Sequence, residues 1–223
     1  MIKAVIFDMY ETLITQYRSP VYFGMQMAED AGIEGDIFDQ LWESTEPDRT
    51  MGLLTMEEAL EKVLKENACY SEELLQKLVA KRKAAKRECF AHLHPQIIPM
   101  LDTLKKNHLR IALISNCYSE EAEVIRESRL FPYFDEVNLS CELNIQKPDA
   151  KIFQRCLEGL QVKAEECVYT GDGGNSELEA ARGAGMRALQ AGWYIKNSAS
   201  RADIQKNGFD WLDSPLEILP YCL

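Results

Sequence analysis

Residues 2–13 read IKAVIFDMYETL, a short apolar run that stops at a carboxylate. A run of this length and composition is typical of a strand buried on both faces of a parallel sheet. Four further runs of this kind appear only after residue 105: LRIALIS (109–115), EVNLS (136–140), ECVYTGD (166–172) and MRALQAG (186–192). Because helical patterns separate most of them, the sequence predicts βαβ units and an α/β, Rossmann-like fold around a parallel sheet.

The segment between the first and second predicted strands is helical throughout. Thr55 and Glu58 have the spacing of a capping box, and a second helix is predicted after Ser71. The first of these helices has one apolar stripe, made of Met56, Ala59, Leu60, Val63 and Leu64. We therefore expect an α/β core of residues 1–14 plus 93–223, interrupted by an all-helical insertion of residues 15–92.

Composition restricts the function classes. Of the 223 residues, 46% are apolar and 27% charged, enough to bury a sizeable core. The net charge of −11 argues against nucleic-acid or membrane binding, and no apolar run approaches the roughly 20 residues of a membrane span. Seven cysteines without any C-x-x-C predict reduced thiols and a cytoplasmic location. The expected assembly is a monomer or a homodimer.

Polar residues gather where the predicted strands end. Asp8 ends the first strand and Ser115-Asn116 the second, while Asp172 lies in a glycine-rich loop after the fourth. Lys147 precedes Pro148 and a helix. Ligands of open parallel sheets bind outside the carboxyl ends of the strands. One lysine, a hydroxyl with an amide, and two carboxylates suit a small anionic substrate with a divalent metal between the carboxylates.

At this point the sequence resembles a known family. DMYET, LISN, KPDAKIF and YTGDGGNSELEAARGAG are similar, in order, to the four motifs of the haloacid dehalogenase (HAD) superfamily. The resemblance covers the whole chain, since the helical insertion stands where members carry a C1-type cap. It implies a HAD-type hydrolase core and catalysis through an aspartyl intermediate.

The resemblance also implies roles for single residues. Asp8 would be the nucleophile. Lys147 would neutralise charge between nucleophile and substrate, and substrate oxygens would be bound from the core by Ser115, Asn116 and Thr12. Mg²⁺ would be held by the carboxylates of Asp8 and Asp172 and by the main-chain carbonyl of Tyr10.

One acid, Glu177, and one arginine, Arg49, have competing interpretations. Glu177 occupies the position of a second motif-four acid and could hold metal-bound water. Alternatively, Ser176 and Glu179 form a capping box and Glu177 merely favours the helix N-terminus. Arg49, in an expected loop ahead of Gly52, is either a substrate contact from the cap or a solvated charge.

Motif one departs from the phosphatase pattern. Phosphatases of this superfamily usually carry an aspartate two residues after the nucleophile, as general acid and base, and here that position is Tyr10. Hydrolytic 2-haloacid dehalogenases have tyrosine there and need no metal, whereas Asp172 in motif four resembles Mg²⁺ phosphatases. A carboxylate facing Asp8 without a cation would be a costly like-charge pair. The sequence therefore favours a Mg²⁺-dependent phosphatase of a small phosphoester. The alternatives are a metal-independent dehalogenase, in which Mg²⁺ is absent, and a catalytically weak binding or regulatory homologue. In the phosphatase, metal-bound water or Glu11 would replace the missing acid.

Overall fold

A single parallel sheet organises the chain, as seen in a computed structural model that describes residues 1–195 and 205–223. Its six strands in these residues run in the order β3-β2-β1-β4-β5-β6, all parallel. Their bounds are Ala4–Phe7 (β1), Arg110–Ser115 (β2), Glu136–Leu139 (β3), Cys167–Gly171 (β4), Arg187–Ala191 (β5) and Asp210–Leu212 (β6). The predicted α/β, Rossmann-like core is confirmed. The last strand, β6, was not predicted from the sequence.

Alternate residues of β1 face two separate apolar cores. Val5 and Phe7 pack with helices α6 (Ile97–Lys106) and α7 (Ser119–Glu127) on one face of the sheet. Ala4 and Ile6 pack with α9 (Ala150–Leu160) and α10 (Glu177–Gly183) on the other. All four strand residues are fully buried, which explains why this strand reads as a continuous apolar run.

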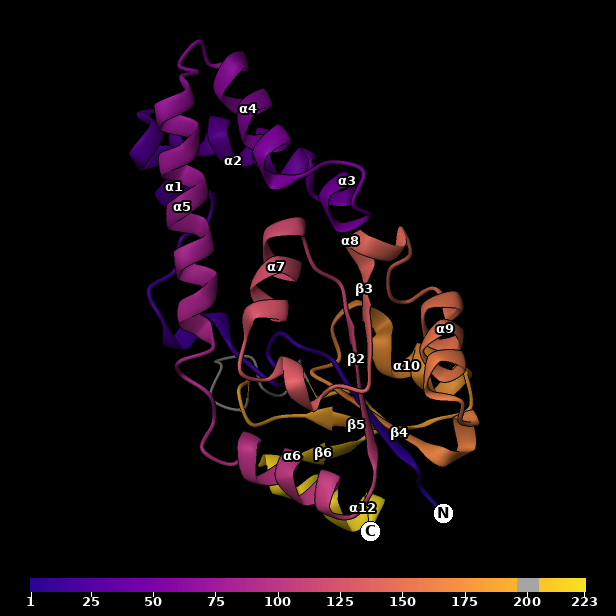
Figure 1. The fold of residues 1–223 in the computed structure, drawn as a ribbon. Coiled ribbons are helices and arrows are strands. Elements are labelled where there is room, and N and C mark those ends of the chain that lie inside the picture. Colours follow the sequence, from indigo (N-terminus) through magenta and orange to yellow (C-terminus); the bar gives the residue numbers. More distant parts are fainter. Residues whose placement is uncertain (196–204) are drawn as a thin grey trace.

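The remaining elements of the core are short. Helix α8 (Ser140–Leu143) follows β3, and α12 (Leu219–Cys222) ends the chain. Turns of 3₁₀ helix lie at Phe131–Tyr133, Ala164–Glu166, Gly174–Ser176 and Pro215–Ile218. Figure 1 places both termini at the end of the core away from the helical insertion.

The helical insertion has an apolar core of its own. A 3₁₀ turn, Gln16–Arg18, leads from β1 into this unit. Its helices are α1 (Gly24–Ala31), α2 (Gly35–Ser44), α3 (Glu46–Thr50), α4 (Met56–Glu66) and α5 (Glu72–Cys89). Residues such as Phe38, Trp42 and Leu60 form a cluster separate from the two cores of the sheet. Figure 1 shows these helices gathered at one end of the molecule, with the long α5 running back toward the sheet.

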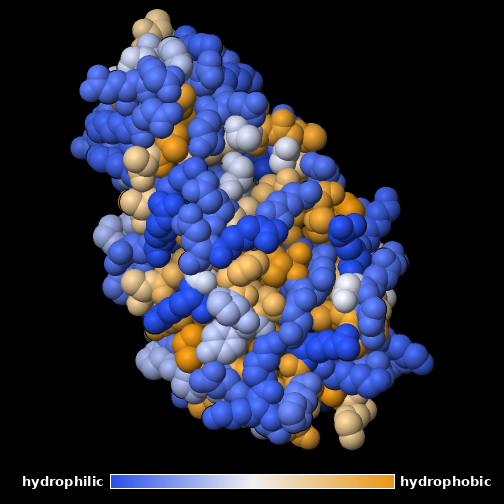
Figure 2. Space-filling model, in the orientation of Figure 1, coloured by the Kyte–Doolittle hydropathy of each residue, from blue (hydrophilic) through white to orange (hydrophobic). Residues whose placement is uncertain are grey.

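Local sequence signals explain where these helices begin. The capping box predicted at Thr55 is present, because its side chain accepts from the Glu58 amide while the Glu58 carboxylate accepts from the Thr55 amide. Ser71 caps α5 through the amide of Leu74. Hydrophilic residues cover most of the face seen in Figure 2, in keeping with the net charge of −11.

Candidate active site

Asp8 leaves the carboxyl end of β1 at the centre of the sheet. Its amide donates a hydrogen bond to the carbonyl oxygen of Thr170 (2.9 Å), one step beyond the paired residues Phe7 and Thr170. Asp172 lies two residues after Thr170, so both carboxylates emerge at the same edge. Because β1 lies between β2 and β4, this edge is where the winding of the sheet reverses, the usual ligand site of such folds.

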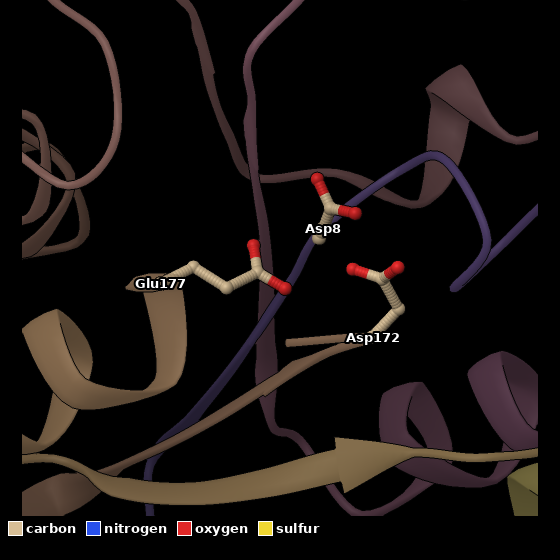
Figure 3. Close-up of side chains that lie close together, drawn as sticks. All are labelled: Asp8, Asp172 and Glu177. Atoms are coloured by element: carbon tan, nitrogen blue, oxygen red, sulfur yellow. The ribbon is translucent and has the colours of Figure 1, made fainter. Parts of the chain in front are cut away.

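Three carboxylates meet at this edge. One oxygen each from Asp8, Asp172 and Glu177 lie within 4.8 Å of one another. Figure 3 shows them converging from β1, from the end of β4 and from the first residue of α10. Asp8 and Glu177 are 6% and 1% exposed. Sequence motifs predicted all three residues, and the fold brings them together.

Lys147 is the cation at the centre of the cluster. Its Nζ donates to Asp8 Oδ1 (2.7 Å) and to Glu177 Oε2 (2.5 Å), and the side chain is buried. Asn116 fixes the main chain of this lysine, since Asn116 Oδ1 accepts from the Lys147 amide (2.8 Å) and Nδ2 donates to its carbonyl (3.0 Å). Both polar atoms of the Asn116 side chain are thus engaged in positioning Lys147.

The charges of the cluster do not balance. Burial, helped by the neighbouring Glu177 and Asp172, raises the pKa of Asp8 to about 7 against the opposing effect of Lys147. Burial, followed by Glu177, raises the pKa of Asp172 to about 6. Burial alone would lower the pKa of Lys147, but Asp8 and Glu177 together hold it above its ordinary value. Three carboxylates around one ammonium form a site that a divalent cation would neutralise.

Hydrogen bonds that the sequence did not predict hold the Glu177 carboxylate in place. Its Oε2 accepts from the hydroxyl of Tyr169 (2.7 Å) and its Oε1 from the amide of Gly173 (3.1 Å). Gly171 leaves the space for it, because a Cβ at that position would lie 2.5 Å from Cδ of Glu177. Tyr169 and Gly171 belong to β4 and to the fourth motif, but nothing in the sequence indicated that they would hold or make room for Glu177.

The capping box expected at Ser176 and Glu179 is wrong. Ser176 has φ of +53° and its side chain makes no hydrogen bond to the helix. Asn175, in the preceding turn, is also left-handed (φ +49°). This backbone bends the chain so that Glu177 points back at Lys147, which rules out the alternative that Glu177 merely favours a helix end.

Two buried hydroxyl side chains lie near Asp8. Thr12 Oγ1 donates to Asp8 Oδ2 (3.4 Å), and the residue is fully buried. Ser115, the last residue of β2, is also fully buried, and its Oγ lies 3.5 Å from the carbonyl oxygen of Asn116. Both residues thus lie among the elements that surround Asp8.

Tyr10 lies two residues after Asp8, and Lys86 Nζ is 5.2 Å from the centroid of its ring. The hydroxyl oxygen is buried and has no hydrogen-bond partner among the described residues. Burial raises the pKa of Tyr10, and Glu121 and Cys117 add to the effect. Glu11 is engaged elsewhere, accepting from Thr15 Oγ1 (2.6 Å) and from the amide of Gln16 (3.0 Å).

A cavity of about 580 Å³ lies between the core and the helical insertion and reaches the cluster at Lys147. Such a volume suits a small metabolite. The core contributes Tyr10, Asn116 and Lys147 to its lining, and the helical insertion contributes Glu46, Pro47 and Thr50. The site is therefore shared between the two units.

Two buried ion pairs join the helical insertion to the core beside this cavity. Arg82 of α5 pairs with Glu120 of α7 (3.2 Å), and Lys86 of α5 pairs with Glu121 (2.5 Å). All four side chains are at most 5% exposed. Arg82, Lys86 and Glu121 line a second cavity of about 340 Å³, and Glu121 also lines the first.

Arg49 lies in α3 and not in a loop, and it is 1% exposed. Its guanidinium is stacked between the rings of Trp42 (3.7 Å) and Tyr118 (4.3 Å), and Nε donates to Thr45 Oγ1. The solvated-charge interpretation is therefore wrong. Arg49 does not line the two cavities described above, although Tyr118 lines both.

Comparison with known proteins identifies the family. The model of the haloacid dehalogenase-like hydrolases matches residues 2–185. The chain belongs to this family. It is 30% identical, over 98% of its length and 96% of the relative's, to a glyceraldehyde 3-phosphate phosphatase of Methanopyrus kandleri.

HAD-like structures of both reaction types share the fold. A HAD phosphatase from Thermococcus onnurineus superimposes with a TM-score of 0.70 at 20% identity, covering 99% of this chain and 97% of that one. A 2-haloacid dehalogenase from Pseudomonas syringae pv. Tomato has a TM-score of 0.70 at 22% identity, covering 100% and 98%. The fold therefore does not separate the two HAD reactions, and the side chains must.

The helices of this HAD-like hydrolase can be compared with the requirements of a membrane span. Within residues 1–195 and 205–223, no helix combines the length and apolar composition that a membrane crossing requires.

Proposed function

We propose that this HAD-like hydrolase is a Mg²⁺-dependent phosphatase of a small phosphoester. The observation that carries the proposal is the cluster of Asp8, Asp172 and Glu177 around a single ammonium. A metal-independent dehalogenase does not need the second carboxylate that Asp172 supplies, whereas Mg²⁺ binds through oxygen ligands of this kind. The phosphatase relative of similar length supports the same reaction.

In this proposal Mg²⁺ would be held by Asp8, Asp172 and the main-chain carbonyl of Tyr10, and Glu177 would hold metal-bound water. The bound ion would supply positive charge for the phosphate oxygens. Glu177 also retains Lys147 beside Asp8.

The chain's own residues then perform the phosphoryl transfer. The Asp8 carboxylate attacks phosphorus, the bond to the leaving oxygen breaks, and a water hydrolyses the aspartyl phosphate. Lys147 orients the Asp8 carboxylate through its 2.7 Å contact and balances the charge of the phosphate. Thr12 donates a hydrogen bond to the Asp8 carboxylate, and Asn116 acts by holding Lys147 in place. Ser115, whose hydroxyl contacts the Asn116 carbonyl, would turn this hydroxyl toward an oxygen of the substrate.

Residues 15–92 act in this proposal as a cap over the substrate. Glu46, Pro47 and Thr50 would face the leaving group across the cavity of about 580 Å³. Arg49 would position Tyr118 by stacking and would not bind substrate directly. Given the cavity and the relative's name, glyceraldehyde 3-phosphate is the first substrate to test. The net charge of −11 favours such a small ligand over nucleic acid or a membrane.

A second candidate function rests on Tyr10. Tyrosine at this position is the dehalogenase pattern, and the leaving-group side of Asp8 has no carboxylate from motif one. A halide leaves without protonation, so a metal-independent 2-haloacid dehalogenase is the competing enzyme. A binding or regulatory homologue would turn over neither class of substrate.

A paired assay separates these functions. Phosphate release from glyceraldehyde 3-phosphate and p-nitrophenyl phosphate is measured with Mg²⁺, and chloride release from 2-chloropropionate with EDTA. We expect phosphate release that EDTA abolishes. Asp172→Ala should remove it, while Glu165→Ala, at an exposed acid remote from the cluster, should not. Chloride release in EDTA without phosphatase activity would establish the dehalogenase, and neither activity would favour the binding homologue.

A further inference from the structure

Two thiols lie in contact directly behind the active-site loop. Cys117 Sγ and Cys141 Sγ are 3.9 Å apart. Cys117 follows Asn116 at the end of β2, and Cys141 is the second residue of α8. All seven cysteines of the chain are free thiols, and among the described residues this is the one sulfur–sulfur contact within hydrogen-bonding range.

The strand register places these two residues at equivalent positions just beyond a paired pair of strand residues. Ser115 of β2 is paired in register with Leu139 of β3, and each cysteine comes two residues later. Parallel strands lie about 4.8 Å apart, and disulfides span Cα distances of about 4.4–6.8 Å. Ser140 ties the segment after β3 to the segment after β2, because its Oγ accepts from the Cys117 amide (3.0 Å) and donates to the Cys117 carbonyl (3.2 Å).

The two thiols differ in access to solvent. Cys141 is half-buried, whereas Cys117 is 1% exposed. The contact with Cys141 and burial raise the pKa of the Cys117 thiol. A dissolved oxidant therefore meets Cys141 first, and Cys117 is placed to react with the product.

Both cysteines are joined to the catalytic site. The residue before Cys117 is Asn116, whose side chain holds the main chain of Lys147. The carbonyl of Cys141 packs against the cap, because a Cβ on Gly52 would lie 2.7 Å from that carbonyl carbon. A covalent bond between these sulfurs would draw together the segment that positions Lys147 and the segment that seats the cap.

We propose that Cys117 and Cys141 are an oxidative modification site, at which a small disulfide such as oxidised glutathione forms a reversible intramolecular disulfide that lowers catalytic turnover. The Cys141 thiolate attacks the glutathione disulfide, giving a mixed disulfide and one glutathione thiolate. Cys117 Sγ then attacks Cys141 Sγ, its proton passes to a glutathione thiolate, and the second glutathione leaves. The two protein thiols are oxidised and one glutathione disulfide is reduced to two thiols.

The test uses the full chain incubated with oxidised glutathione and then alkylated. The expected result is the loss of two free thiols of the seven, a non-reduced peptide joining residues 117 and 141, and full reversal by dithiothreitol. Phosphatase turnover should fall in parallel, by up to ~10²-fold, because a misplacement of about 1 Å near the reacting groups costs that much.

Matched variants decide the assignment. Cys117→Ser and Cys141→Ser should retain turnover in oxidised glutathione, whereas Cys69→Ser should remain sensitive, because Cys69 is also half-buried but lies in the cap. Absence of the linked peptide, a link elsewhere, or a link with unchanged turnover would overturn the proposal. The peptide map does not depend on the substrate, so a reduced protein without phosphatase activity would refute the proposed function and not the disulfide.

Discussion

Substituting Gly171, which lies against the Glu177 carboxylate, should displace Glu177 from the charge cluster. In Gly171→Ala the new Cβ would lie 2.5 Å from Cδ of Glu177, and closer still to Oε1. Carbon atoms in contact are about 3.5–4.0 Å apart, so the carboxyl group must move by about 1 Å. It cannot then keep its bonds to Lys147, Tyr169 and the Gly173 amide.

The stability cost follows from the buried pair that is broken. Removing a partner from a buried ion pair costs about 3–5 kcal/mol, and relief of the repulsion between Glu177 and Asp8 offsets part of this. We expect the free energy of unfolding of the metal-free protein to fall by about 3 kcal/mol. At about 2–4 °C per kcal/mol for a chain of this size, Tm should fall by about 6–12 °C.

Thermal melts of four variants test this reasoning. Gly183→Ala is the control, since a Cβ at that exposed helix position meets no atom within 4 Å, and Tm should stay the same or rise slightly. In a Glu177→Ala background the further change Gly171→Ala should cost almost nothing, because the clash has gone. If Gly171→Ala lowered Tm equally in both backgrounds, Glu177 would not be the group that requires this glycine.

Three further outcomes are expected. Asp8→Asn should leave the circular dichroism spectrum unchanged and reduce turnover by several orders of magnitude; retention of more than about a tenth of the rate would exclude attack by Asp8. Mg²⁺ should raise Tm more at about pH 8 than at about pH 5. The pKa values of Asp8 and Asp172 are raised, so at low pH these carboxyl groups carry protons that the metal must displace, and the same protons make the metal-free fold more stable there. A rise in Tm with Mg²⁺ that does not depend on pH would contradict this. Tyr10→Phe should keep turnover within about twofold, since the hydroxyl is buried without a partner. Tyr10→Asp should raise the ratio of the alkyl phosphate rate to the aryl phosphate rate, because a positioned acid contributes ~10²–10⁴-fold to the departure of a poor leaving group. An unchanged ratio would show that no acid was missing.

The sequence predicted what depends on local pattern. Continuous apolar runs marked five of the strands, and the capping residues Thr55 and Ser71 marked where α4 and α5 begin. β6 escaped because a strand of three residues at the edge of the sheet gives little pattern. α3 escaped for a similar reason, since its five residues, EPDRT, contain a proline and read as a loop.

The site was predicted as a set of residues but not as a geometry. Motifs indicated Asp8, Lys147, Asp172 and Glu177, because each lies in one of the stretches that resemble the four motifs of the HAD superfamily. No local signal indicated that Tyr169, inside β4, would hold Glu177. Left-handed residues defeated the capping-box reading at Ser176, since backbone angles there follow from the turn and not from the side chain.

The buried ion pairs between α5 and α7 restrict how this enzyme can open. If the helical insertion moved away from the core as one body, Arg82 would separate from Glu120 and Lys86 from Glu121, and the four charges would lose their ion-pair partners. Each broken pair costs about 3–5 kcal/mol until water reaches it. We therefore expect α5 to stay packed against α7 while α3, which lines the cavity with Glu46 and Pro47, moves to admit substrate. Substrate would then enter from the α3 side only, while the two ion pairs keep the α5 side closed.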